Sequence, residues 1–214
     1  MRPLEILLSL FTIAVIAVLP HTGLLPNFAY SIPILILVWF ALKFSGERFK
    51  DIGFSFKGFE FKAIPIGLLV AVLTLAFMQL IFFPTLELFV SFEETDVELY
   101  DLIRENLFQC ILLIFFGWLI GGFYEEIVFH AFIYTRLEKM IRGKYAASIN
   151  FFLTAMIFGV YHIQLGADGL INAFVVGCVY LALYLYFKRN LWYSIICHGF
   201  YNTLVMILIH LGYL

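Results

Sequence analysis

Long apolar segments alternate with short polar ones along the whole chain. A helix needs about 20 mainly apolar residues to cross the hydrocarbon core of a bilayer, and the apolar segments reach or approach that length. The pattern predicts seven helices, at residues 4–19, 27–42, 63–83, 107–132, 147–163, 170–187 and 191–213. The expected fold is therefore an all-α, polytopic transmembrane helical bundle of about seven spans.

The polar connections between these segments differ in charge. Twelve of the thirteen Lys and Arg residues fall at the N-terminus or in the second, fourth and sixth connections, and only Arg104 falls on the other side. Because basic loops are retained in the cytoplasm, this distribution predicts a cytoplasmic N-terminus. The sequence has no internal repeat and no soluble domain boundary, so residues 1–214 are predicted to form a single integral-membrane domain.

Two connections are long enough to form structure of their own. Residues 43–62 combine basic and aromatic side chains with three glycines, which is typical of a loop at the membrane interface. Residues 84–105 are acidic, and we expect a solvated linker there. Part of this linker has the apolar spacing of an amphipathic helix that lies on the membrane, at Val97, Tyr100, Leu102 and Ile103.

Composition supports a membrane protein and excludes other classes. The chain is 64% hydrophobic and 13% charged, with a mean hydropathy of +1.01, which is too apolar for a soluble domain. Its net charge of −2 gives no basic field, so no nucleic acid partner is expected. Cys110, Cys178 and Cys197 lie in apolar segments without CxxC spacing, so we expect neither a disulfide framework nor a zinc knuckle. The expected location is the cell membrane, as a multi-pass protein in the lipid bilayer.

The candidate chemistry begins at the adjacent carboxylates Glu125 and Glu126, which follow the apolar residues 107–122. An ionisable side chain at bilayer depth costs several kcal/mol unless it faces a bundle interior and finds partners there. The alternative is that the pair caps a helix at the interface. Four more strongly polar residues fall inside predicted spans and favour the buried site, namely His130, His162, His198 and Asn202.

The spacing of these residues places them on shared helix faces. Residues four apart differ by about 40° around a helix, so Glu126 shares a face with His130, and His198 shares one with Asn202. Glu125 lies about 100° from Glu126, so the two carboxylates can have different roles. A carboxylate that takes a proton from water, an imidazole that positions the water and donors for an oxyanion are the parts of a hydrolytic site.

The same residues resemble the motifs of a known family. Glu125-Glu126-x-x-x-His130, Phe158-x-x-x-His162 and His198-x-x-x-Asn202, all within residues 121–205, resemble EExxxR, FxxxH and HxxxN. These motifs belong to the CAAX protease and bacteriocin-processing family, also called CPBP or Abi, of intramembrane glutamate proteases. The family is related to the type II CAAX prenyl endopeptidases.

The resemblance implies a role for each matched residue. Glu125 would activate the attacking water and His162 would help to hold it, while His198 and Asn202 would stabilise the oxyanion. Glu126 would be a supporting carboxylate. His130 stands where the family has Arg, and an imidazole cannot make the bidentate ion pair of a guanidinium. Phe158 and His130 would support the site, and no cofactor is implied.

A metal-dependent mechanism is the alternative for the same hydrolysis. Glu126, His130, His162 and His198 form a set of three histidines and one carboxylate that suits Zn or another transition metal. The sequence has no HExxH motif, so the usual metalloprotease-like geometry is not indicated. We therefore favour the metal-free reaction.

The predicted function is cleavage of a peptide bond in a membrane-associated or lipidated, CAAX-like protein. A leader-bearing peptide, as in bacteriocin processing, is an equally good substrate. The active site is expected to open to the cytoplasmic half of the membrane. Two alternatives come from other classes, namely a non-catalytic binding or immunity protein and a transporter that uses the carboxylates as a proton relay.

Overall fold

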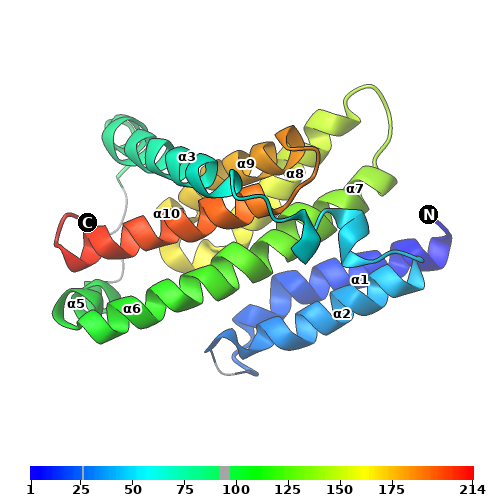
Figure 1. The fold of residues 1–214 in the computed structure, drawn as a ribbon, viewed down its shortest axis with the longest axis horizontal. Coiled ribbons are helices and arrows are strands. Elements are labelled where there is room, and N and C mark those ends of the chain that lie inside the picture. Colours follow the sequence, from blue (N-terminus) through cyan, green and yellow to red (C-terminus); the bar gives the residue numbers. More distant parts are fainter. Residues whose placement is uncertain (26, 92–96) are drawn as a thin grey trace.

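The computed structural model describes residues 1–25, 27–91 and 97–214, and every regular element in these ranges is a helix (Figure 1). The predicted all-α membrane bundle is therefore confirmed. The α-helices are α1 Pro3–Val18, α2 Ser31–Phe44, α3 Ala63–Phe77, α4 Phe83–Leu86, α5 Val97–Glu105, α6 Leu107–Phe116, α7 Tyr134–Met140, α8 Ala146–Tyr161, α9 Gly166–Tyr186 and α10 Trp192–His210. Short 3-10 turns join them at η1 Leu19–His21, η2 Asn27–Tyr30, η3 Phe49–Ile52, η4 Phe56–Gly58 and η7 Ile163–Leu165.

Two stretches are wound more widely, as π-helix: η5 Met78–Phe82 and η6 Gly117–Ile133. The sequence predicted helix at both places but not this winding. Together α6, η6 and α7 make one continuous helix, Leu107–Met140. Wide π-turns within α-helices are frequent at functional sites, and η6 carries both adjacent carboxylates.

All seven predicted helices are present, but fewer of them qualify as full membrane spans. Within the described ranges, five helices are long and apolar enough: Pro3–His21, Ala63–Leu86, Leu107–Met140, Ile163–Tyr186 and Trp192–His210. A sixth candidate joins Phe28–Phe44 to Phe49–Gly58 across a bend of 95°. The remaining apolar helix, α8, has 16 residues. The count of seven spans and the cytoplasmic N-terminus stay predictions.

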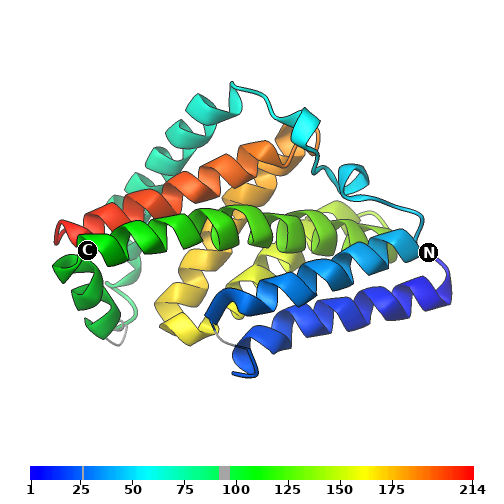
Figure 2. The ribbon, with the colours of Figure 1, turned by 60° about the horizontal axis from the view of Figure 1, so that its bottom comes forward.

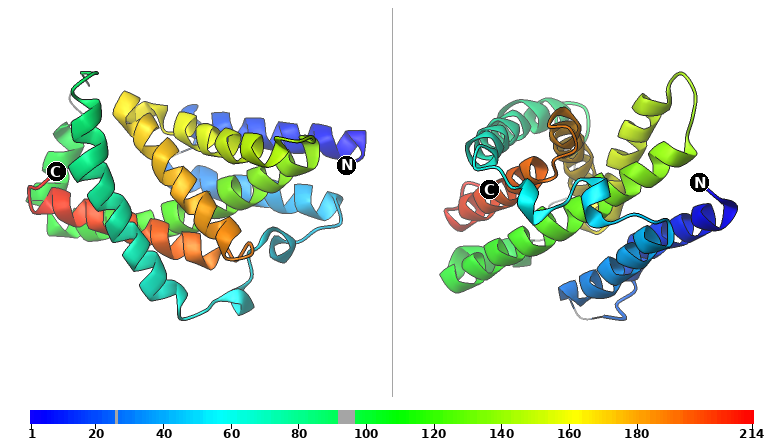
Figure 3. Two further views of the ribbon diagram at one scale, coloured as in Figure 1. Left: turned by 90° about the horizontal axis from the view of Figure 1, so that it is seen from above. Right: turned by 45° about the vertical axis from the view of Figure 1, so that its right-hand side comes forward.

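The continuous helix Leu107–Met140 is the centre of the molecule. Its π-helical part η6 contacts α2, α8, α9 and α10. In Figures 1 and 2 the helix lies between α10 on one side and the α1–α2 hairpin on the other. Figure 3 shows α3 on the opposite side of the molecule from that hairpin, where it packs along α10. Side chains of η6 are thus enclosed by helices from both halves of the chain.

The loop between α2 and α3 is held against the turn between α9 and α10. Tyr184 Oη donates a hydrogen bond to Ile52 O at 3.0 Å, and Trp192 Nε1 donates one to Ser55 O at 2.8 Å. The side chains of Phe56 and Phe61 are 75% and 82% exposed. Apolar side chains that stand out from a basic loop support the predicted position at the membrane interface.

The other predicted features of the connections have mixed outcomes. Residues 97–105 form a helix, α5, which was the alternative to a solvated linker at this place. Glu93, Glu94 and Asp96 of the acidic linker lie outside the described residues, as does Pro26 in the turn between the first two spans. The three cysteines are all free, as predicted.

A buried ion pair joins α7 to the end of α2. The side chain of Arg136 is fully buried, and its Nη2 lies 2.5 Å from Glu47 Oε2. Lys139 Nζ lies 2.5 Å from the other oxygen, Glu47 Oε1. Glu47 therefore holds the C-terminal end of the central helix to the α1–α2 hairpin.

We predict that Arg136→Ala destabilises the protein by about 3 kcal/mol, because it removes a fully buried cation and leaves the partly buried Glu47 with Lys139 as its remaining partner. The measurement is thermal unfolding of the detergent-solubilised protein. Arg48→Ala is the matched control, since the Arg48 side chain is 72% exposed and its pair with Asp51 lies at the surface. Equal unfolding temperatures for the two variants would contradict the prediction.

Candidate active site

Glu125 is the carboxylate of the pair that faces two histidines from other helices. It is 7% exposed, and its Oε2 lies 3.8 Å from His162 Nε2 and 3.9 Å from His198 Nε2. His162 follows the last residue of α8, and His198 lies in α10. Three helices thus bring together a carboxylate and two imidazoles that are up to 73 residues apart in the sequence (198 − 125).

Glu126 has different neighbours. It is fully buried, and its Oε1 lies 2.9 Å from His198 Nδ1 in a hydrogen bond that an ionised carboxylate accepts. The same Oε1 lies 3.0 Å from His130 Nδ1, although neither nitrogen of His130 makes a hydrogen bond with good geometry within the described part of the chain. Glu126 therefore fixes one side of the His198 ring, and His130 is a close but weaker partner.

The contact between Glu126 and His130 has the predicted spacing of four residues. It involves one carboxylate oxygen, and Glu126 Oε2 has no hydrogen-bond partner among the described residues. The predicted loss of a bidentate pair agrees with this geometry.

The orientation of His162 is set by its own helix. His162 Nδ1 lies 2.9 Å from Phe158 O, and because a carbonyl oxygen only accepts, the proton is on Nδ1. In the neutral ring the lone pair of Nε2 is then available on the side of Glu125. The Phe158 ring packs edge-on against His162 and His130, with centroids 4.6 Å and 5.0 Å away. Phe158 thus supports both imidazoles.

Asn202 lies one turn beyond His198 on α10, and its Nδ2 donates a hydrogen bond to Gly117 O at 3.3 Å. Gly121, one turn further along η6, also faces this pair. A Cβ on Gly121 would collide with Asn202 Nδ2 and would lie 3.0 Å from His198 Nε2. The absence of a side chain at Gly121 therefore allows the two polar groups of α10 to approach the central helix.

The structure adds residues that sequence reasoning missed. Tyr180 of α9 stacks on His198, with ring centroids 4.4 Å apart. Near Glu125, Tyr161 Oη donates a hydrogen bond to Tyr30 Oη at 3.2 Å, and the Tyr30 ring packs edge-on against Tyr124. No pattern in the sequence singles out these tyrosines, because the chain is 19% aromatic and none of them stands at a position that the motifs specify.

The four residues of the predicted metal set do not surround one point. His130 and His198 both direct Nδ1 toward Glu126 Oε1, whereas His162 lies beside Glu125. Across the residues that the structure covers, no group of three or more His, Cys, Asp or Glu side chains is arranged to hold a metal ion. This geometry gives the metal-dependent alternative no support, and metal content stays a matter for experiment.

The fold and the site together define a multi-pass helical membrane protein with a buried cluster of carboxylates and imidazoles. Residues 107–204 match the family described as type II CAAX prenyl endopeptidase Rce1-like. The matched segment contains all three motifs, so the predicted resemblance to the CAAX proteases is confirmed for this part of the chain. It supports, in general terms, a CAAX-type intramembrane endopeptidase. Neither the curated proteins nor the solved structures gave a match to the chain.

We predict that Gly121→Ala lowers the rate of peptide cleavage roughly 10- to 100-fold, because the added methyl group displaces Asn202 and His198 from the site. The measurement is kcat of the purified variant on a peptide that the wild type cleaves. Gly58→Ala is the control, since a Cβ there meets no atom closer than 3.9 Å. A Gly121→Ala protein with the wild-type kcat would show that the close approach is not needed.

Proposed function

We propose that this protein is an intramembrane endopeptidase that hydrolyses a peptide bond in a membrane-associated or lipidated protein, with a water activated by Glu125. The observation that carries the proposal is the position of Glu125 Oε2, 3.8 Å from His162 Nε2 and 3.9 Å from His198 Nε2. These distances are too long for direct hydrogen bonds. They suit three groups that share one water molecule lying to one side of them.

In the proposed reaction Glu125 takes one proton from this water as the oxygen forms a bond to the scissile carbonyl carbon. His162 holds the water through Nε2, which is free to accept a hydrogen bond because Nδ1 donates to Phe158 O. When the carbon–nitrogen bond breaks, Glu125 returns its proton to the leaving amine. One water is consumed, and the products are a carboxylic acid and an amine, which become a carboxylate and an ammonium group when the acid proton passes to the amine.

The oxyanion of the tetrahedral intermediate needs hydrogen-bond donors other than Glu125 and His162. Asn202 Nδ2 has two protons and uses one on Gly117 O, so the second can reach the oxyanion. His198 already directs Nδ1 to Glu126. It donates from Nε2 only in its protonated form, and an ionised Glu126 stabilises that form. Glu126 is therefore proposed as a supporting carboxylate, with His130 as its second neighbour.

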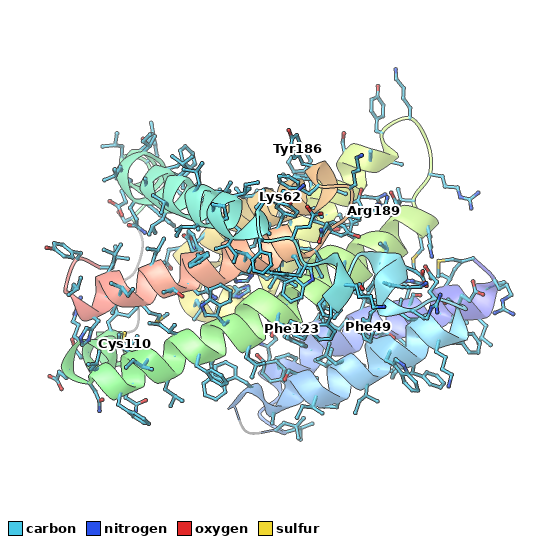
Figure 4. All side chains as sticks on the ribbon, viewed as in Figure 1. Phe49, Lys62, Cys110, Phe123, Tyr186 and Arg189 are labelled. Atoms are coloured by element: carbon cyan, nitrogen blue, oxygen red, sulfur yellow. The ribbon has the colours of Figure 1, made fainter. Side chains whose placement is uncertain are left out.

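An apolar groove beside η6 supports a lipidated substrate. It has a volume of about 270 Å³ and lies between α2, η6 and the loop after α2, lined by Leu35, Ile36, Trp39, Phe49, Phe54, Phe123 and Ile127. Phe49 and Phe123 of this lining are labelled in Figure 4. Phe123 and Ile127 lie two residues before and two residues after Glu125 on η6, so the groove and Glu125 share this helix but not one face of it. A lipid chain in the groove would bring an attached peptide to the helix that carries Glu125.

The groove also indicates from which side of the membrane a substrate would reach the site. Phe49 and Phe54 come from the loop that contains five of the basic residues, and positive charge is typical of the cytoplasmic side. We therefore propose that a substrate enters from the cytoplasmic half of the cell membrane. Its peptide portion would come from the cytoplasm and its lipid chain from the bilayer.

We predict that Glu125→Gln lowers kcat roughly 100- to 10,000-fold on a farnesylated CAAX peptide without changing the fold, because glutamine cannot take the proton. Cleavage is followed by mass spectrometry, and the fold by thermal unfolding. Glu138→Gln is the control, since Glu138 pairs with Arg189 and is 36% exposed in its side chain. A protein whose biological function survives Glu125→Gln would instead be a binding or immunity protein.

Metal dependence is tested in the same preparations. Glutamate catalysis predicts that chelator leaves cleavage unchanged and that elemental analysis finds no stoichiometric metal. Bound metal near one per chain, with activity lost to chelator and restored by metal, would replace this mechanism with the metal-dependent one.

We predict that Ile36→Trp raises KM for a farnesylated peptide about tenfold, because the larger ring fills the groove and removes contacts worth about two methylene groups. The KM for the same peptide without the lipid should not change. Ile32→Trp is the control on the same helix, since Ile32 is 64% exposed and does not line the groove. An equal effect of Ile36→Trp on both peptides would exclude the groove as the lipid site.

A further inference from the structure

Helix α9 carries none of the three motifs, yet it contributes a side chain to the site. It contacts η6, α8 and α10, the three elements that hold the motif residues. Its residue Tyr180 is fully buried, and the phenol ring stacks on the imidazole of His198 with centroids 4.4 Å apart and planes inclined by 19°. Nearly parallel rings with centroids at this distance form an offset stack.

The stack restrains a movement of His198 that its hydrogen bond leaves free. The bond from Nδ1 to Glu126 Oε1 fixes one edge of the ring, but the ring can still tilt about that edge. Tyr180 covers one face of the imidazole, and Phe158 meets it edge-on with centroids 6.0 Å apart. With the plane fixed, Nε2 stays on the side of Glu125, 3.9 Å from Oε2.

Tyr180 also contacts the second imidazole beside Glu126. Its ring meets His130 edge-on, with centroids 5.9 Å apart and planes at 85°. One aromatic side chain thus touches both histidines that flank the buried carboxylate. His130 stands where the family motif has Arg, so the packing around this position differs from that around a guanidinium.

The hydroxyl group of Tyr180 does not account for the position of the residue. Its oxygen is buried and has no hydrogen-bond partner among the residues that the structure describes. The contacts that Tyr180 makes with the site are contacts of its ring, with His198 and His130, so the ring is the part to which we assign a role.

We propose that Tyr180 is a positioning residue, which holds the His198 ring in the plane where Nε2 can serve the reaction at Glu125. This inference rests on the proposed peptidase function. The ring, not the hydroxyl, is the essential feature.

The test compares three substitutions of Tyr180 in the full-length detergent-solubilised protein. Tyr180→Phe keeps the ring and should keep kcat within about twofold, with an unfolding temperature equal to or above that of the wild type. Tyr180→Leu and Tyr180→Met remove the planar ring. They should lower kcat by on the order of 100-fold with KM unchanged, since a small displacement of a reacting group has that effect. The Met variant is included because the volume and flexibility of its side chain keep the core filled if the Tyr180→Leu protein does not fold.

Tyr184→Leu is the matched control on the same helix. Tyr184 is also fully buried, but it donates its hydrogen bond to Ile52 O in the loop after α2, and its ring packs edge-on against Tyr134, which is outside the three motifs. This variant should unfold at a lower temperature and keep its kcat per folded molecule. A loss of kcat in Tyr184→Leu as large as in Tyr180→Leu would show a general packing effect and overturn the inference.

A second readout does not depend on activity. Diethyl pyrocarbonate modifies accessible imidazole nitrogens, and mass spectrometry locates the modified residue. His198 should react slowly in the wild type and in Tyr180→Phe, and at least several-fold faster in Tyr180→Leu and Tyr180→Met. Unchanged reactivity in the last two variants would overturn the positioning role.

The two readouts separate the two proposals. If neither the wild type nor the Glu125→Gln variant cleaves the peptide, the peptidase proposal fails. The rates of modification by diethyl pyrocarbonate would still decide whether Tyr180 holds His198. If Tyr180→Phe loses kcat as strongly as Tyr180→Leu, the hydroxyl is the essential group and the inference is wrong.

Discussion

The structure depends on the free-energy cost of two adjacent carboxylates on a helix that crosses the membrane. Each of them must find compensation inside the bundle, and they find it in different ways. Glu126 is fully buried and bonded to His198, whereas Glu125 has only imidazole nitrogens at 3.8 and 3.9 Å. The two carboxylates are therefore in different settings: Glu126 is hydrogen-bonded through Oε1 to His198, whereas Glu125 faces two imidazoles at longer range. In the proposed reaction, a water molecule lies between Glu125 and these imidazoles.

This division requires helices that approach the central helix closely. The glycines of η6 let α10 bring His198 and Asn202 against it, because a Cβ at Gly121 would occupy the place of their side-chain atoms. Helix α8 supplies His162 at its very end, where the ring is held by the carbonyl of Phe158. Helix α9 closes the site with Tyr180. The site thus exists only where four elements meet.

The same packing explains how a histidine can occupy position 130. Its ring lies among Phe158, Tyr180 and Gly177, and a Cβ on Gly177 would lie 3.5 Å from His130 Nε2. These neighbours form a compact aromatic space around a flat ring. A guanidinium is longer and needs several hydrogen-bond acceptors, which aromatic rings do not offer. The replacement of Arg by His thus agrees with the surroundings that the rest of the chain provides.

The sequence by itself determined the helices and the list of candidate groups. Apolar runs of span length must form helices in a bilayer, because no other element satisfies its own backbone there, and all seven predicted helices are present. The spacing of four residues also predicted that His130 would lie beside Glu126. The residues of the three motifs could be chosen because charge and imidazole are rare in apolar segments.

Only the tertiary structure decided which contacts each of these groups makes. Sequence spacing cannot tell that His198 turns Nδ1 to Glu126 and Nε2 toward Glu125, since this depends on how α10 packs against η6. It cannot select Tyr180 from the twelve tyrosines, because an aromatic residue in an apolar helix has the same pattern whether it faces lipid or the site. The number of full spans stays a prediction, since hydropathy counts apolar residues but takes no account of the bend of 95° after α2 or of the 16-residue length of α8. Contacts between distant segments depend on how the helices pack against one another, and the local periodicity of the sequence does not determine that packing.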